Sequence, residues 1–382
     1  NGSAYPPERV ACREHADLAY ESAVKGMVLL RNENGVLPLR REEMKRIAVI
    51  GKLAARANIG DYGSSRVRPP YVITPLEGIR AAAGHVEVVY DSGDELTRAS
   101  RVAREADATV VVVGITGKEE GEYIPYAMAG GDREDLSLRD NDAHLVGIVS
   151  RSTDRCVVVL EAGSAVLTSD WSRLVPAIVM AWYPGMEGGK ALAAILFGDE
   201  NPSGKLPVTF PESNGQLPPL DRKARRVEYG YHHGYRLLDR EGAEPAFPFG
   251  FGLSYTTYEY SNLRLSADEM GSDGSVTVQA DIANAGGMAG EEVVQLYVAY
   301  PPSPVERPAK ELKGFSRIHL EPGEKKTVSF ALKASDLAYF DAGAGEWRVA
   351  EGEHTVYVGS SSRAADLHLS APIGVSPELS NN

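Results

Sequence analysis

Short, wholly apolar runs that recur through the first half of the chain constrain its fold more than any other feature. Thr109-Val-Val-Val-Val113 is one of them, and its β-branched residues are typical of a strand buried on both faces. Such strands occur almost only in parallel sheets that helices cover on both sides. The other runs expected to form strands of this sheet are residues 46–50, 86–90, 156–160 and 177–182.

Segments with a helical spacing of apolar residues separate these runs. We expect helices at residues 7–31, 96–105, 136–150 and 191–197. A further helix is expected to begin at Thr74-Pro75, because proline suits the first turn. This alternation of strand and helix predicts an α/β domain, which we place at residues 1–212.

The pattern changes in the second half of the chain. Residues 213–256 are rich in Pro, Gly and Tyr and show little periodicity, so we interpret them as a structured linker. From residue 257, short alternating runs separated by turn residues predict an all-β sandwich of the immunoglobulin or fibronectin type. We place this second domain at residues 257–375 and a tail at residues 376–382.

Composition excludes several classes of partner. The 382 residues carry 53 acidic and 40 basic side chains, a formal net charge of −13 and no basic cluster, so we expect no nucleic-acid binding. No apolar run approaches the length that spans a bilayer, so we expect no membrane insertion, and residues 1–7 do not resemble a signal peptide. The chain has only two cysteines, Cys12 and Cys156, which favours a reducing, cytoplasmic compartment.

The loop that follows Val113 is the first candidate site. It carries Glu119, Glu120 and Glu122 among glycines, and ligands of open α/β sheets bind outside the carboxyl ends of the strands. Like-charge repulsion in such a group would raise one pKa and keep that glutamate protonated as an acid. A solvated acidic loop explains the same residues, and their spacing alone does not separate the two interpretations.

Other motifs give weaker signals. The glycine-rich segment at residues 60–65 matches neither the dinucleotide fingerprint nor the P-loop, and no G-x-S-x-G elbow occurs. His232 and His233 are adjacent, so on an extended chain they point in opposite directions and do not form a metal site. Asp170 and Trp171 follow the fourth strand, where a helix-capping aspartate with a packing tryptophan is the plainer interpretation.

Several longer segments together resemble the C-terminal two-thirds of glycoside hydrolase family 3 enzymes, the β-glucosidases and β-xylosidases. The resemblance extends over almost the whole chain. Its segments include Val28-Leu-Leu-Arg-Asn32, Thr74-Pro-Leu-Glu-Gly78, Trp182-Tyr-Pro-Gly-Met-Glu-Gly-Gly189, Phe197-Gly-Asp-Glu-Asn-Pro-Ser-Gly-Lys-Leu-Pro-Val-Thr-Phe-Pro211, Phe247-Pro-Phe-Gly-Phe-Gly-Leu-Ser-Tyr255 and Gly290-Glu-Glu-Val-Val-Gln-Leu-Tyr297.

The resemblance implies a six-stranded α/β sandwich domain followed by a fibronectin type III-like domain. It also implies that Glu120 is the general acid/base, because the family's E-G element matches Glu120-Gly121 upstream of Asp132-Arg133. The spacer between the two elements is longer here than in the compact motif, so Glu122 and Glu119 remain alternatives. No metal or cofactor is expected. The residues expected to flank the leaving group of the substrate are Tyr62, Ser64, Ser65, Arg66 and Tyr123.

The resemblance also exposes a missing part. The family's nucleophilic aspartate lies in a Ser-Asp-Trp motif of a barrel domain that this chain does not contain. Ser169-Asp170-Trp171 has the same letters but lies within the α/β domain, so we do not assign it as the nucleophile. We therefore expect a retaining β-glycosidase that is inactive without a barrel polypeptide as partner.

The alternative is a non-catalytic carbohydrate-binding or scaffolding subunit derived from the same family. The sequence leaves open the identity of the sugar and whether the chain forms a homo-oligomer.

Overall fold

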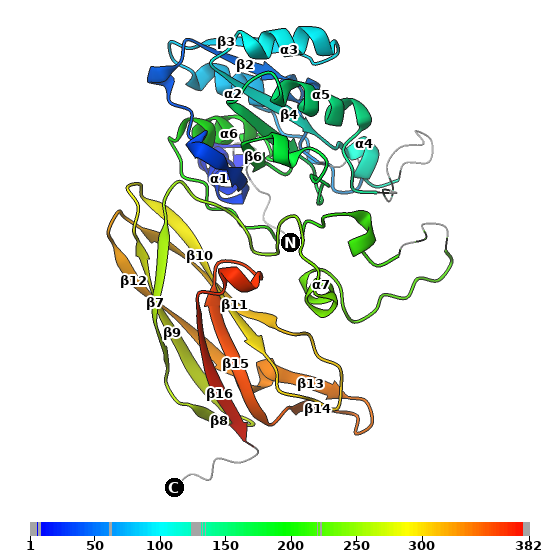
Figure 1. Ribbon diagram of the computed structural model, residues 1–382, viewed down its shortest axis with the longest axis vertical. Coiled ribbons are helices and arrows are strands. Elements are labelled where there is room, and N and C mark those ends of the chain that lie inside the picture. Colours follow the sequence, from blue (N-terminus) through cyan, green and yellow to red (C-terminus); the bar gives the residue numbers. More distant parts are fainter. Residues whose placement is uncertain are drawn as a thin grey trace.

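Two domains make up the computed structural model, an α/β domain and an all-β domain, with a connecting segment between them (Figure 1). The structure describes residues 6, 9–60, 63–123, 131, 133, 135–219, 221 and 224–376. None of the helices among these residues is long and apolar enough to cross a membrane.

A six-stranded sheet with the order β1-β6-β5-β4-β2-β3 forms the centre of the α/β domain. Five of the strands are mutually parallel, and the apolar runs seen in the sequence form them. All seven residues of β4 are buried, which is why this strand reads as a continuous apolar run. The parallel strands are β2 (Arg46–Ile50), β3 (Glu87–Asp91), β4 (Ala108–Gly114), β5 (Cys156–Glu161) and β6 (Ala177–Met180).

The sixth strand corrects the prediction of one long N-terminal helix over residues 7–31. The helix α1 (Arg13–Gly26) is shorter, and β1 (Val28–Asn32) follows it and pairs antiparallel with β6. Leu29 packs into the core on one face of the sheet, whereas Val28 and Leu30 pack into the core on the other. Three consecutive apolar residues with two buried faces suit a strand and not a helix. The sheet is therefore mixed, with an antiparallel edge strand.

Helices cover both faces of this sheet, as the alternating pattern predicted. On one face lie α1, α2 (Pro75–Ala82) and α6 (Gly188–Phe197), and on the other α3 (Leu96–Arg104) and α5 (Asp140–Ser150). The Thr74 side chain caps α2 in a capping box with Glu77, which fixes the helix start seen in the sequence. The short helix α4 (Gly117–Glu120) follows β4 directly. The predicted α/β sandwich is thereby confirmed.

The second domain is an antiparallel sandwich, as predicted, apart from one parallel pairing at its edge. A five-stranded sheet, β11-β10-β15-β16-β8, packs on a three-stranded sheet, β12-β9-β7, and the hairpin β13-β14 lies at its side. The strands are β7 (Tyr258–Leu265), β8 (Glu269–Gly271), β9 (Ser275–Asn284), β10 (Gly290–Ala299), β11 (Glu311–Leu320), β12 (Lys325–Lys333), β13 (Ala338–Asp341), β14 (Glu346–Val349), β15 (Gly352–Gly359) and β16 (Leu369–Ser376). Residues 377–382, the rest of the predicted tail, lie outside the described residues.

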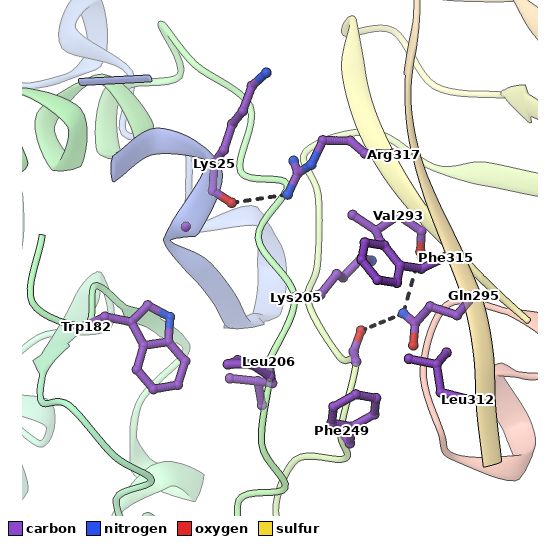
Figure 2. A pocket seen from close by; sticks show the side chains of 13 residues that line it. Lys25, Trp182, Lys205, Leu206, Phe249, Val293, Gln295, Leu312, Phe315 and Arg317 are labelled. Carbon is purple, nitrogen blue, oxygen red and sulfur yellow. Dashed lines mark hydrogen bonds between the residues drawn. The ribbon is translucent and has the colours of Figure 1, made fainter. Parts of the chain in front are cut away.

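Ion pairs and hydrogen bonds join the two domains. Lys205 Nζ lies 3.1 Å from a carboxylate oxygen of Glu292 on β10, and both side chains are largely buried. Arg317 on β11 donates to Ser203 Oγ at 2.7 Å and to the carbonyl oxygen of Lys25 at 3.3 Å (Figure 2). The connecting segment adds the helix α7 (Tyr235–Glu241), which lies beside the second domain in Figure 1. The two domains therefore contact each other through specific polar interactions and are not joined by a flexible linker alone.

A cavity of about 490 Å³ opens at this junction. Figure 2 shows its largely apolar lining, which includes Trp182, Leu206, Phe249 and Phe315. None of the residues predicted for catalysis or substrate binding lines it. Polar groups suited to acid/base chemistry gather elsewhere, at the carboxyl ends of the parallel strands.

Candidate active site at the carboxyl ends of the parallel strands

The acidic loop begins with a tight turn and one turn of helix. Gly114 ends β4 with φ +155°, and a Cβ atom there would lie 1.9 Å from the carbonyl oxygen of Glu161, so only glycine fits. The side chains of Thr116 and Glu119 then form a capping box at the start of α4. Glu119 also pairs with Arg139, whose Nη1 lies 3.2 Å from Glu119 Oε1. Both oxygens of Glu119 are thus used in holding the loop.

Glu120 lies in a ring of four hydrogen-bond donors. Its Oε1 accepts from the backbone N–H of Gly163 and from the Tyr183 hydroxyl at 2.6 Å. Its Oε2 accepts from Ser164 Oγ at 2.7 Å and from Arg133 Nη1 at 3.4 Å. The Glu120 side chain is only 10% exposed. Because the carboxylate is both screened from bulk water and fully hydrogen-bonded, its position is well defined.

The order of the strands explains why these donors meet. Gly163 and Ser164 follow β5, and Tyr183 follows β6, while Glu120 follows β4. In a parallel sheet the carboxyl ends of adjacent strands lie on one edge, so the three connections converge there. None of Gly163, Ser164 and Tyr183 was predicted as a site residue from the sequence. The signal available was their place directly after two predicted strands.

Gly163 must be a glycine for this arrangement to form. A Cβ atom at this position would lie 2.7 Å from Cε2 of Tyr183 and 3.1 Å from Oε1 of Glu120. The backbone before Tyr183 is also unusual, because Trp182 has φ +57°. Trp182 lines the junction cavity, and Tyr183 lines the cavity at Glu120.

A cavity of about 330 Å³ adjoins Glu120 and contains the polar ends of its partners. Its walls come from Glu120, Gly131, Arg133, Leu136, Gly163, Ser164 and Tyr183. Burial, together with the hydrogen bond and charge of Glu120, raises the pKa of Tyr183 well above its ordinary value. Tyr183 therefore remains a neutral donor at any physiological pH. A carboxylate, a phenol, a hydroxyl and a guanidinium around one cavity can bind sugar hydroxyls and transfer a proton.

The other predicted site residues that the structure describes do not line this cavity. The backbone N–H of Ser64 donates to Glu122 Oε2 at 2.5 Å, so the serine-rich loop and the acidic loop are in contact. Ser64, Ser65, Arg66 and Tyr123 are exposed. Tyr62 and Asp132 lie outside the described residues.

The three glutamates of the loop do not share one set of partners, which corrects the picture of a crowded acidic group. Glu119 faces Thr116 and Arg139, and Glu122 faces Ser64. Glu120 alone contributes to the cavity. Neighbouring residues on a short helix point in different directions, so proximity in the sequence did not translate into a cluster.

The motif Ser169-Asp170-Trp171 has a structural role. Trp171 is buried at 4% exposure, as predicted for a packing tryptophan. The predicted helix cap at Asp170 is wrong: the residue at the N-cap of the following short helix is Trp171, and no side-chain cap bond forms. Across the described parts of the chain, no group of three or more His, Cys, Asp or Glu residues is placed to hold a metal ion.

Comparison with known proteins identifies the family. Residues 27–255 match the family model described as the glycosyl hydrolase family 3 C-terminal domain, and residues 292–362 match a fibronectin type III-like domain. The chain belongs to glycosyl hydrolase family 3. Within the family, it is 38% identical over 365 residues to thermostable beta-glucosidase B of Acetivibrio thermocellus, covering 91% of this chain and 47% of that protein. It is also 38% identical over 369 residues to a beta-xylosidase of Formosa agariphila, covering 93% of this chain and 49% of the relative.

Solved family 3 structures have the same fold over nearly the whole chain. The beta-D-glucoside glucohydrolase of Trichoderma reesei superposes with a TM-score of 0.85 at 29% identity, covering 98% of this chain and 58% of that one. Beta-glucosidase 3B of Thermotoga neapolitana, solved in complex with glucose, gives a TM-score of 0.82 at 32% identity, with coverages of 94% and 54%. The chain thus spans about half the length of the curated relatives it matches.

Proposed function

We propose that this chain contributes the acid/base half of a retaining β-glycosidase active site that acts on terminal β-D-glucosides or related β-glycosides. The observation that carries the proposal is the placement of Glu120 in a polar cavity at the carboxyl ends of β4, β5 and β6. Glu120 would protonate the glycosidic oxygen as the bond breaks. It would then take a proton from the incoming water.

The contacts of the three glutamates support Glu120 as the acid/base. Glu119 is held by the capping box and by Arg139 and does not line the cavity, so it is not placed to meet a substrate there. Glu122 is exposed and accepts from the backbone N–H of Ser64, and it is the remaining alternative. Two donors of Glu120 are the hydroxyls of Ser164 and Tyr183. A hydroxyl can accept as well as donate, so Ser164 can turn its proton away when Glu120 becomes protonated.

We propose that the nucleophile comes from outside the described residues of this chain. Glu120 is the one carboxylate among the described residues that line the cavity, and glycoside hydrolysis with retention needs a second carboxylate about 5 Å from the first. We propose that an aspartate of a barrel domain supplies it, either on another polypeptide or on a further segment of the same protein. Ser64, Ser65, Arg66 and Tyr123, with Tyr62, would then flank the leaving group.

The test is substitution of Glu120 in the complete assembly that includes the barrel. Glu120→Ala is expected to reduce hydrolysis of unactivated glucosides by about 10²–10⁴-fold, the usual contribution of a general acid, and to affect activated aryl glucosides least. Azide should restore turnover of the activated substrates because it needs no general base. Glu119→Gln and Glu122→Gln serve as matched controls.

Full activity of Glu120→Ala on unactivated glucosides would reject the assignment. If Glu122→Gln gave the large loss and the azide rescue instead, the acid/base role would belong to Glu122. The reaction class would then stand and the residue assignment would fail.

A further inference from the structure

A buried carboxyl group lies directly behind the residues that hold Glu120. Glu161 is the last residue of β5 and is 1% exposed. Asn58, itself 5% exposed, hydrogen-bonds to this carboxyl group. Glu161 Oε2 has no hydrogen-bond partner among the described residues. An ionised carboxylate in such a place would lack the hydrogen bonds that normally compensate for burial, so the neutral acid is the form that fits.

The backbone around Glu161 leads to Glu120 by two short routes. Through the first, the carbonyl oxygen of Glu161 accepts the N–H of Ile115 at 2.8 Å. The carbonyl oxygen of Ile115 in turn accepts from Asn58 Nδ2 at 3.0 Å and lies 3.4 Å from the Tyr183 hydroxyl, which donates to Glu120. Through the second, Gly163 follows Glu161 by two residues and donates its N–H to Glu120.

We propose that Glu161, in its neutral form and paired with Asn58, is a positioning residue that holds Ile115 and Gly163 where they fix Tyr183 and Glu120. When Glu161 ionises, the uncompensated buried charge displaces this backbone and loosens Oε1 of Glu120 from its two donors, Gly163 and Tyr183. The consequence for catalysis rests on the proposed function of Glu120, but the structural coupling does not.

Charged groups of the neighbouring elements are engaged elsewhere. Glu161 points to the same face of the sheet as Val157 and Val159, because side chains alternate along a strand, and this face carries α2 and α6. On that face Lys52 pairs with Asp94, and Glu77 caps α2. Glu187 accepts from Tyr71, and Lys190 lies over the Tyr20 ring. Arg56 and Arg80 are exposed. At the end of β4, Arg139 binds Glu119, Asp142 and the carbonyl oxygen of Gly114.

The shift in the pKa of Glu161 agrees with this geometry. Burial raises the pKa of Glu161 to about 8, and the hydrogen bond from Asn58 opposes the shift only in part. Glu161 is therefore neutral in the folded protein at neutral pH and ionises at mildly alkaline pH. The proposed coupling should act over the same range.

The experiment follows the amide signal of Gly163 in the 15N-labelled chain by NMR from pH 6 to pH 9.5. In the wild-type protein we expect this signal to shift or broaden with a midpoint near pH 8. Glu161→Gln, a neutral side chain of the same shape, should abolish that transition and keep the low-pH position throughout. The amide of Gly374, a glycine of the second domain whose N–H is hydrogen-bonded to the carbonyl oxygen of Asp268, serves as the control and should not show this transition.

Glu161→Ala tests whether the contact of the Glu161 side chain with Asn58 matters or only the absence of a buried charge. Loss of the partner of Asn58 should displace the Gly163 signal at every pH, whereas Glu161→Gln retains the native signal. If Glu161→Ala fails to fold, the comparison of wild type with Glu161→Gln still decides the matter. An identical transition in Glu161→Gln, or no transition in the wild type, would overturn the proposal.

The result of the NMR experiment does not depend on whether Glu120 takes part in hydrolysis. In the complete assembly, Glu161→Gln should also extend the alkaline limb of the kcat profile to higher pH. A Gly163 transition without any such change in kcat would leave the coupling in place and count against the role of Glu120.

Discussion

Replacing Glu161 by Gln is expected to give the α/β domain a stability advantage that grows as the pH rises from 4.5 to about 8. In the folded protein the pKa of Glu161 is raised from 4.5 to about 8 by burial, whereas in the unfolded chain the group titrates near its ordinary value. Between these values the folded state binds one proton more than the unfolded state. The free energy of unfolding therefore falls as the pH rises through this window.

The size of this loss in the free energy of unfolding follows from the shift in the pKa of Glu161. At about 1.4 kcal/mol per pH unit, the full window corresponds to a loss of about 5 kcal/mol by pH 8. Relaxation of the backbone around the charge reduces this value, so it is an upper bound. Below pH 4.5 Glu161 is protonated in both the folded and the unfolded state, so its contribution to the pH dependence of stability vanishes. Since a domain has only about 5–15 kcal/mol of stability, the loss is large enough to measure.

Urea unfolding at pH 5, 6, 7 and 8, followed by tryptophan fluorescence, measures the difference between wild type and Glu161→Gln. Trp171 and Trp182 belong to the α/β domain, and a Trp347→Phe background removes the signal of the exposed tryptophan in the second domain. The Glu161→Gln advantage should grow from pH 5 to pH 8. Glu105→Gln, which removes an exposed carboxylate of the same domain, should show no such trend. A Glu161→Gln difference that is constant with pH would refute the reasoning.

Two further predictions concern the domain junction and the candidate active site. Lys205→Ala leaves the Glu292 carboxylate buried without its partner and should destabilise the protein by about 3–5 kcal/mol in urea unfolding; an unchanged midpoint would mean that the pair is solvated. Gly163→Ala places a methyl group against the Tyr183 ring, so hydrolysis by the complete assembly should fall at least tenfold, while Gly287→Ala, which meets nothing within 4 Å, should leave it unchanged. Equal activities of these two variants would show that Gly163 is not required.

Much of the fold could be predicted because its signal is local. Five of the six strands of the first sheet were predicted from apolar runs, since a strand buried on both faces needs apolar residues at consecutive positions. The missed strand, β1, follows α1 with only Met27 between them, so its apolar residues were counted as part of the helix. The family, too, was recognisable from segments such as Trp182-Tyr-Pro-Gly185, because they are contiguous.

The partners of Glu120 could not be predicted in the same way. Gly163 and Tyr183 lie 43 and 63 residues from Glu120 in the sequence, and they meet it because β4, β5 and β6 are adjacent in the sheet. Strand order depends on how the helices pack, and the composition of a single strand does not encode it.

The sequence by itself thus determined the class of each segment, the family, and the loop that carries the candidate acid. Only the tertiary structure decided which of its glutamates faces the cavity and which donors surround that glutamate. It also decided that Glu161, one glutamate among many in the sequence, is fully buried, which raises its pKa. The physical reason is that apolar periodicity is a property of neighbouring residues, whereas burial and hydrogen bonding depend on what the fold brings together.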